Sequence, residues 1–183
     1  LSLRIEDAEI YINKALDKGL KVLAEGAQGT LLDVEFGSYP YVTSSNTVTA
    51  GACTGLGLAP SRLGEVYGVF KAYCTRVGSG PFPTELFDHA GENLRKKGHE
   101  FGSTTGRPRR CGWLDMPALK YAVMINGVTR LVMTKADVLS DMEQIRICNS
   151  YLTPEGHVID YPQAWFGTDA PQPLYEDMDA WGG

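Results

Sequence analysis

The hydrophobic residues near the start of the chain recur at three- and four-residue steps. Apolar side chains follow this spacing across residues 1–18, with acidic and amide residues between them, which predicts an amphipathic helix that ends at Gly19. The apolar run at positions 20–24 fits a short buried strand. Small and hydroxyl-bearing residues dominate positions 25–60, where we expect mostly loop and short helix.

The rest of the chain alternates between strand-like and helix-like patterns. β-branched and aromatic residues are typical of strands, while an aspartate cap, a glycine stop or a proline in the first turn indicates a helix. These signals predict strands over 66–77 and 131–133, helices over 88–97 and 115–126, and a β-hairpin over 143–161. Strands separated by helices and followed by a hairpin predict an α/β fold, in which helices surround a mixed β-sheet.

Length and composition indicate a globular domain. The chain has 183 residues, of which 43% are hydrophobic and 21% charged, so it can bury a core. Its formal net charge of −5 disfavours a general nucleic-acid or anionic-membrane surface. The sequence has no long apolar run and no signal-like opening segment, so we expect neither membrane insertion nor secretion.

The four cysteines, Cys53, Cys74, Cys111 and Cys148, form no C-x-x-C pair and lie at no metal-ligand spacing from a histidine. Zinc and redox sites need such spacing, so we expect reduced and mostly buried thiols, as in a protein of the reducing cytoplasm. The chain opens without methionine inside the predicted helix. We therefore expect it to be an internal piece of a longer polypeptide.

Two polar segments in the first third of the chain are candidates for ligand binding. Residues 25–30 (EGAQGT) follow the predicted strand, where ligands bind in open α/β sheets, and Gln28 offers an amide that donates and accepts. An ordinary tight turn explains this spacing equally well. Hydroxyl and amide side chains at 39–47, which include Thr43, suit phosphate oxygens, and a helix cap with a solvated loop is the alternative.

Two further motifs carry charge. Residues 103–110 (STTGRPRR) place hydroxyls before guanidiniums, a pattern that grips carboxylates or phosphates; the alternative is a solvated basic loop. Residues 134–137 (TKAD) directly follow a predicted strand. The Asp137 carboxylate can accept hydrogen bonds from the N1–H and 2-amino groups of guanine, and the Lys135 stem can lie along the base. A polar turn at the end of a strand has the same short pattern.

In their order and content, these motifs resemble the adenylosuccinate synthetase family. The similarity covers essentially the whole chain and is most specific at residues 25–46, 71–86, 101–115 and 134–139. It implies that residues 1–183 form one segment, truncated at both ends, of a single large catalytic domain with a P-loop-NTPase-like fold. It also implies a ligase of purine biosynthesis that converts IMP, L-aspartate and GTP to adenylosuccinate, GDP and phosphate, with Mg²⁺, as a cytoplasmic homodimer.

The resemblance assigns roles to individual residues. The IMP-binding positions fall on Gln28, Thr43, Val77 and Arg107, and Gln28 has a supporting catalytic role at the purine 6-oxygen. The aspartate-binding loop falls on Ser103, Thr104, Thr105, Gly106, Arg107, Pro108 and Arg109. The GTP-binding positions fall on Arg109, Lys135, Ala136 and Asp137. No metal ligand is expected in this segment.

The sequence departs from the family pattern in two respects. Pro108 stands where many members carry another basic residue, which bears on the mobility of the loop. The glycine-rich phosphate loop, the aspartate that acts as base and metal ligand, and the catalytic histidine belong to a portion of the family that this sequence lacks, as does a C-terminal piece of the guanosine pocket. We therefore expect the segment alone to be inactive.

Two other functions compete with the ligase segment. A non-catalytic nucleotide- or nucleic-acid-binding module could be built on the basic stretch at 106–110, although one basic loop in an acidic chain fits a small anion better than a polyanion. A fragment of a regulatory GTPase also uses a K-x-D guanine motif, but it has no amino-acid substrate for residues 103–110 to grip. The sequence therefore favours small-molecule substrates over nucleic acid or a membrane.

Overall fold

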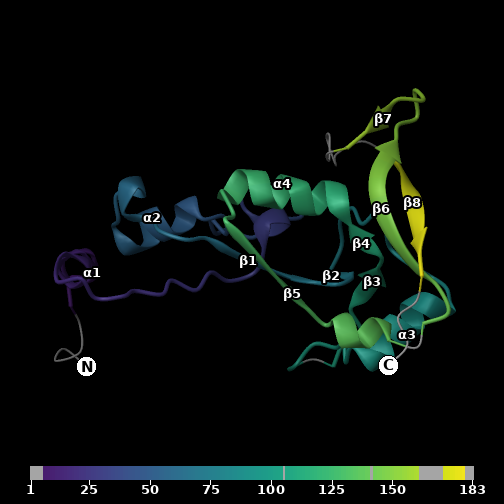
Figure 1. Ribbon diagram of the computed structural model, residues 1–183, viewed down its shortest axis with the longest axis horizontal. Coiled ribbons are helices and arrows are strands. Elements are labelled where there is room, and N and C mark those ends of the chain that lie inside the picture. Colours follow the sequence, from purple (N-terminus) through teal and green to yellow (C-terminus); the bar gives the residue numbers. More distant parts are fainter. Residues whose placement is uncertain (1–5, 105, 141, 161–170, 180–183) are drawn as a thin grey trace.

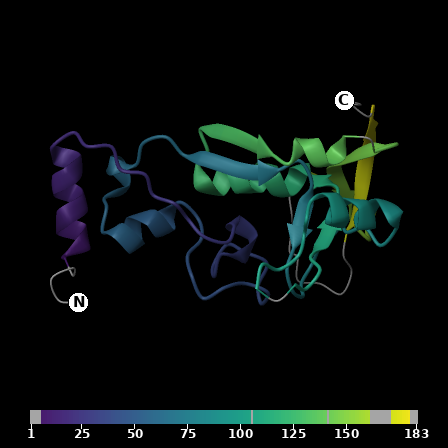
Figure 2. The same ribbon diagram turned by 90° about the horizontal axis from the view of Figure 1, so that it is seen from below.

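The computed structural model describes residues 6–104, 106–140, 142–160 and 171–179. These residues form an elongated molecule, with the first helix at one end and the longest strands at the other (Figures 1 and 2). No helix in the described ranges is long and apolar enough to cross a membrane.

The helices begin and end at the local signals that the sequence provides. They are α1 (Ala8–Asp17), α2 (Ala50–Leu56), α3 (His89–Lys97) and α4 (Met116–Asn126), with short 3₁₀ helices at Thr30–Leu32, Pro60–Arg62 and Ala136–Leu139. The Asp88 side chain accepts the Gly91 N–H at 3.2 Å, and Asp115 accepts the Ala118 N–H at 3.0 Å. These N-caps confirm the predictions for α3 and α4. The first helix starts at Ala8, later than predicted.

Within the described residues, the strands form three small sheets in place of one. They are β1 (Tyr67–Lys71), β2 (Cys74–Arg76), β3 (Arg110–Gly112), β4 (Leu114–Asp115), β5 (Arg130–Thr134), β6 (Ile145–Leu152), β7 (Val158–Ile159) and β8 (Gln172–Met178). β1 pairs with β5 in parallel, and β2 pairs with β3 antiparallel. β6 pairs with β4 in parallel and with β7 and β8 antiparallel. The mixed α/β class is therefore confirmed.

Two strand predictions are wrong. Residues 20–24 form no strand: they run extended from α1 toward the body of the molecule (Figure 1), and Leu23 is 91% exposed. An apolar run becomes a strand only where a partner ladder and a covering layer exist, and here this segment has neither among the described residues. The single strand predicted over 66–77 breaks at Ala72 and Tyr73, which turn into the core, so that β1 and β2 join different sheets.

The predicted hairpin is confirmed, with one strand added. β6 and β7 pair through Tyr151–Ile159 and Leu152–Val158. Gly156 closes the turn at φ +84°, a left-handed backbone that glycine adopts without strain. The sequence did not reveal β8, which pairs along nearly the whole length of β6 (Figure 1).

The core lies where α3, β3 and the 3₁₀ helix at Ala136–Leu139 meet. Its buried residues are Ala72, Tyr73, Leu94, Cys111, Trp113, Val138, Leu139, Met142 and Ile145. All four cysteines are free thiols, of which Cys111 and Cys148 are buried and Cys53 and Cys74 partly buried.

Candidate functional site

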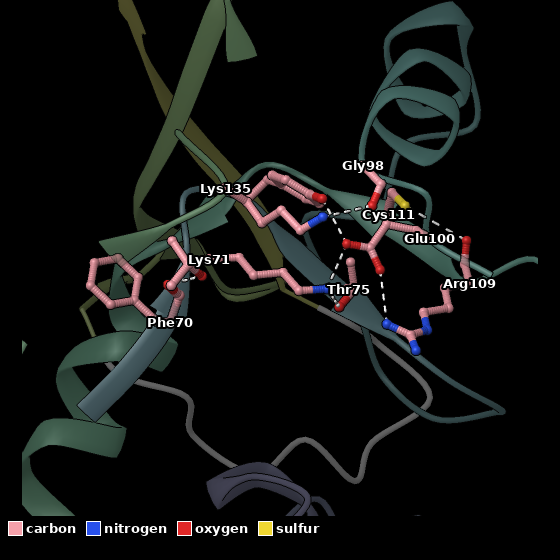
Figure 3. A network of polar contacts seen from close by, with 10 residues as sticks. Phe70, Lys71, Thr75, Gly98, Glu100, Arg109, Cys111 and Lys135 are labelled. Atoms are coloured by element: carbon pink, nitrogen blue, oxygen red, sulfur yellow. Dashed lines mark hydrogen bonds and ion pairs between the residues drawn. The ribbon is translucent and has the colours of Figure 1, made fainter. Parts of the chain in front are cut away.

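A buried carboxylate, Glu100, lies at the centre of a polar network beside this core (Figure 3). The residue is 1% exposed. Its Oε1 accepts hydrogen bonds from Lys71 Nζ and from the Tyr73 hydroxyl, each at 2.6 Å, and its Oε2 accepts one from Arg109 Nη1 at 2.9 Å. Burial raises the pKa of the Glu100 carboxyl, but these three donors outweigh burial and hold the pKa below its usual value. Glu100 is therefore ionised in the folded protein.

The break between β1 and β2 delivers two of these donors. Lys71 ends β1 and Tyr73 follows it in the bend, so both side chains reach Glu100 from one short segment. Lys71 Nζ also donates to the Thr75 hydroxyl at 3.1 Å. Burial and the hydrogen bond to Glu100 raise the pKa of Tyr73, so its phenol remains a donor. Lys71 and Thr75 also line an open pocket of about 310 Å³.

The predicted aspartate loop is a narrow hairpin that rises from Glu100. The Arg109 N–H donates to the Glu100 carbonyl at 2.9 Å, and the Gly102 N–H donates to the Arg107 carbonyl at 2.9 Å. A bridge between Phe101 and Pro108 lies between these two bonds. Arg109 therefore sits at the base of the hairpin, next to the buried carboxylate.

The tip of this hairpin is exposed. Gly106 turns it, with φ +63° and an N–H that donates to the Gly102 carbonyl at 2.8 Å. Ser103, Thr104 and Arg107 are exposed at the same end, while Thr105 lies outside the described residues. The hydroxyls and the Arg107 side chain are thus presented where a small anion can reach them.

The predicted guanine motif approaches Glu100 from the other side. Lys135 follows β5 and donates from Nζ to the Gly98 carbonyl at 3.0 Å, two residues before Glu100 (Figure 3). The next residues, Ala136 and Asp137, open a 3₁₀ helix, and the Asp137 side chain is exposed. The structure therefore brings Arg109 and Lys135 to one segment, residues 98–100, although the two motifs are well separated in the sequence.

The backbone is strained at two of the predicted ligand-binding residues and beside Glu100. Among the described residues, the non-glycine positions with positive φ are Gln28 at +66°, His99 at +52° and Lys135 at +61°. Such conformations are costly for residues with a Cβ and concentrate at functional sites. Gln28 and Lys135 are predicted ligand-binding residues, and His99 lies within the segment that joins the two charged motifs.

A second carboxylate, Asp33, follows the Gln28 segment in the chain and is fully buried. Its Oδ1 accepts the N–H groups of residues 35 and 36 at 2.9 and 3.0 Å, and its Oδ2 those of residues 47 and 48 at 2.6 and 3.1 Å. Burial raises the pKa of Asp33, but the four backbone donors outweigh it and lower the pKa below its usual value. One side chain therefore ties the turn at residues 35–36 to the end of the Thr43 segment at residues 47–48.

The Thr43 hydroxyl faces the Gln28 loop. It donates to the Leu32 carbonyl at 3.1 Å, and the Thr43 N–H donates to the same carbonyl at 2.8 Å. A further bond runs from the Thr47 hydroxyl to the Gly29 carbonyl, beside Gln28, at 2.7 Å. The first two predicted motifs thus form one double loop.

Arg76 links this double loop to the sheet below the aspartate hairpin. Its Nη2 donates to the Ser38 hydroxyl and to the Tyr41 carbonyl, both at 3.1 Å. In the β2–β3 ladder Arg76 stands opposite Arg110, and burial together with that second cation lowers the pKa of Arg76. Val77, the predicted ribose contact, follows Arg76 and is 72% exposed.

Sequence reasoning missed the residues that organise this site, which are the buried Asp33, Tyr73 and Glu100 and the partly buried Lys71. Lys71 stood in a stretch that carried the family resemblance, but without a role. Glu100 lay just before the charged motif that was noticed. A buried carboxylate is identified by partners from other parts of the chain, and no local spacing reveals them.

The described residues contain no group of three or more histidine, cysteine, aspartate or glutamate side chains that could hold a metal ion. The magnesium ligands of the family are predicted to lie outside this segment. Their placement elsewhere stays a prediction.

Comparison with known proteins gives consistent matches. The family model described as adenylosuccinate synthetase matches residues 1–183. The adenylosuccinate synthetase of Cytophaga hutchinsonii is 58% identical over 179 residues, which are 98% of this chain and 42% of that protein. The enzyme of Bacteroides fragilis is 59% identical over 178 residues, again 42% of its length. The chain thus spans less than half of the curated relatives that it matches.

Solved structures agree with the sequence matches. The fully ligated adenylosuccinate synthetase from Plasmodium falciparum matches with a TM-score of 0.92 and 44% identity, covering 98% of this chain and 43% of that one. A cyanophage S-2L succinoaminodeoxyadenylate synthetase, bound to dGMP and dATP, matches with a TM-score of 0.59 and 27% identity over 71% of this chain and 39% of that one. The arrangement of the chain therefore recurs in the first of these structures over nearly its whole length and in the second over part of it.

Proposed function

The chain belongs to the adenylosuccinate synthetase family, and on that premise we propose that it supplies most of the substrate-recognition residues of a GTP-dependent ligase. The ligase joins IMP and L-aspartate into adenylosuccinate and converts GTP to GDP and phosphate. In this proposal, residues 1–183 are one segment of a catalytic domain with a P-loop-NTPase-like fold.

One observation carries the proposal: the segment at residues 98–100 receives Lys135 on one side and Arg109 on the other. A ligase of this type must hold a guanine nucleotide and an amino acid around one reaction centre. The juxtaposition brings a guanine-type motif and a carboxylate-gripping loop together in that way. A solvated basic loop and an unrelated polar turn would have no reason to share this anchor.

On the GTP side, the exposed Asp137 carboxylate accepts from the N1–H and 2-amino groups of guanine. Adenine lacks this pair of donors, so the contact selects the base. The stem of Lys135, held at its end by the Gly98 carbonyl, lies along the base face, and Ala136 between them offers backbone contacts.

On the aspartate side, the hairpin at residues 101–109 holds the carboxylates. Arg107 at the exposed tip and Arg109 at the base present guanidiniums, which bind carboxylates bidentately. The hydroxyls of Ser103 and Thr104 and the turn residue Gly106 complete the loop, Thr105 is assigned to it from the sequence alone, and Pro108 keeps its return arm extended. Arg107 also faces IMP, and Arg109 also faces GTP.

On the IMP side, Gln28 contacts the purine 6-oxygen and supports its charge, Thr43 contacts the 5′-phosphate, and Val77 contacts the ribose. The Thr43 backbone is already fixed by its N–H bond to the Leu32 carbonyl, so its hydroxyl can turn to a phosphate without moving the chain. The strained backbone of Gln28 is consistent with a side chain aimed by its loop.

We propose that the remaining parts of the reaction come from the portion of the family fold that this sequence does not span. These are the glycine-rich phosphate loop, the general base, the histidine and the Mg²⁺ ligands. Mg²⁺ neutralises charge on the transferring phosphoryl group when it is bound. We also propose that the full-length protein is a homodimer that acts in the cytoplasm. Its partners in this proposal are small-molecule substrates, with no nucleic acid or membrane.

The test is phosphate release from GTP by the full-length protein that contains this chain. We expect release only when IMP and aspartate are both present. Release without aspartate would favour a regulatory GTPase, and salt-dependent binding of unspecific RNA without turnover would favour a nucleic-acid module.

A further inference from the structure

We propose that Glu100 is a positioning residue for the ligase reaction: it orients Arg109 for the aspartate substrate and ties the aspartate hairpin to the guanine-recognition segment. The inference rests on the function proposed above and names a residue that the sequence motifs did not include.

Glu100 sets the direction of the Arg109 side chain. In the described part of the chain, the Arg109 guanidinium has one partner, Oε2 of Glu100, and its buried Nε has none. A guanidinium carries five N–H donors, so this single contact sets its direction and leaves other donors for a ligand. Fixing the side chain before the substrate arrives removes an ordering cost from binding.

Contacts also connect Glu100 to the lysine of the predicted guanine motif. The Tyr73 hydroxyl, which donates to Glu100, also lies against Gly98: a Cβ added to Gly98 would come within 2.2 Å of that oxygen. Gly98 in turn accepts from Lys135, the lysine of the guanine motif. A packed path therefore runs from Lys135 through Gly98 and Tyr73 to Glu100 and on to Arg109. Figure 3 shows the positions of Lys135, Gly98, Glu100 and Arg109 along it.

The buried charge of Glu100 points to a role other than stability. A buried charge is weak evidence for stability, because replacement of a buried ion pair by apolar residues is often neutral or stabilising. The Glu100 carboxylate is instead shared by two cations, Lys71 and Arg109, of which one reaches into the substrate loop. Its position at the base of the hairpin suits an orienting role.

The experiment uses the full-length protein and measures KM for each of the three substrates. In Glu100→Gln, the amide keeps the shape but loses the charge and one acceptor, so we expect the aspartate KM to rise about tenfold or more while the IMP KM stays within about twofold. Glu100→Asp keeps the charge on a shorter stem and should give a smaller rise. The matched control is Glu85→Gln, which breaks the comparable ion pair to Arg110, one residue along, and should leave all three KM values within about twofold.

A double-mutant cycle separates orientation from general stability. If Glu100 acts through Arg109, then Glu100→Gln adds little to the aspartate KM of Arg109→Leu, within about twofold. A structural role predicts instead a loss of active protein with all three KM values unchanged. If Glu100→Gln does not fold, Glu100→Asp carries the same comparison alone and in combination with Arg109→Leu.

Three results would overturn the inference: an unchanged aspartate KM in the folded variant, an equal rise in all three KM values, or full additivity with Arg109→Leu. Failure of the proposed function looks different, because the unmutated full-length protein then shows no phosphate release that depends on IMP and aspartate. In that case the inference falls with the function on which it rests.

Discussion

Lys135 Nζ donates a hydrogen bond to the carbonyl of Gly98 at 3.0 Å, across 37 residues of sequence. This contact anchors the lysine of the guanine motif at the end of α3, two residues before the carboxylate that holds Arg109. In the proposed function, recognition of the base and recognition of the amino acid are therefore arranged around one short segment of backbone.

Replacement of either loop arginine by leucine in the full-length protein should weaken aspartate binding. The loss of one partner of a charge-assisted pair costs about 2–5 kcal/mol, so the aspartate KM should rise about 30-fold or more in Arg107→Leu and in Arg109→Leu. Arg107→Leu should also raise the IMP KM, and Arg109→Leu the GTP KM. Steady-state kinetics with each substrate varied in turn measures these effects.

The control for the arginine variants is Arg130→Leu. Arg130 is exposed on β5 and pairs with Glu65, away from the hairpin. All three KM values should stay within about twofold in this variant. An unchanged aspartate KM in both Arg107→Leu and Arg109→Leu would show that this loop does not bind aspartate.

Asp33 should make the stability of the fold depend on pH in the acid range. Its pKa is lowered in the folded state, so its stabilisation is present above the usual aspartate value of 3.8 and is lost as the pH falls through the folded pKa. Asp33→Asn places an amide where four N–H donors converge and should lower the free energy of unfolding by roughly 1.5–3 kcal/mol at pH 7. The difference between the unmutated protein and the variant should shrink as the pH falls below about 4.

Urea unfolding at pH 7 and near pH 3 measures this difference. Asp17→Asn serves as the control, because Asp17 is exposed in a surface ion pair with Arg62 and should contribute less than about 1 kcal/mol at either pH. A stability difference for Asp33→Asn that is the same at both pH values would show that its charge is not what the four donors stabilise.

Three of the cysteines should be unreactive in the folded protein. Burial raises the pKa of Cys111 to about 11 and that of Cys74 and Cys148 to about 12, so very little thiolate is present at pH 8. Alkylation followed by mass spectrometry should label these thiols only after denaturation, with the partly exposed Cys53 as the internal comparison. Native labelling of Cys111 or Cys148 would contradict the described core.

Features set by neighbouring residues could be predicted from the sequence. Asp88 and Asp115 cap their helices through bonds to a residue three positions ahead, so the sequence alone locates α3 and α4. The turn of the β6–β7 hairpin is closed by Gly156 in the same local way. The charged motifs could also be located from the sequence, because Arg107, Arg109, Lys135 and Asp137 stand in short, contiguous stretches, and their binding roles stay predictions.

Features set by distant partners could not be predicted. The apolar run at 20–24 has the composition of a strand but lies exposed, because no strand pairs with it among the described residues. The strand at 66–77 breaks because Tyr73 turns toward Glu100, which is 27 residues away. Such a contact depends on the packing of α3 against β3, which no spacing in the sequence encodes.

The 183-residue chain by itself should not catalyse the reaction. Catalysis of phosphoryl transfer depends on several charged groups at once, and loss of one such group can cost about 10³–10⁵ in rate. No glycine-rich loop that ends in lysine is present in the sequence, and the described residues assemble no metal site. Phosphate release that depends on IMP and aspartate, from a sample shown by mass to be this chain alone, would refute this expectation.

The central claim is that residues 98–100 bring a guanine clamp to an aspartate loop, and the most direct measurement is the kinetics of Asp137→Asn in the full-length protein. The amide has the size of the carboxylate but turns a donor toward the two donors of guanine. At about 1–3 kcal/mol for such a bidentate contact, the GTP KM should rise about 5- to 150-fold, while the IMP and aspartate KM values stay within about twofold. Equal changes in all three KM values, or none, would mean that Asp137 does not recognise guanine and would contradict the account.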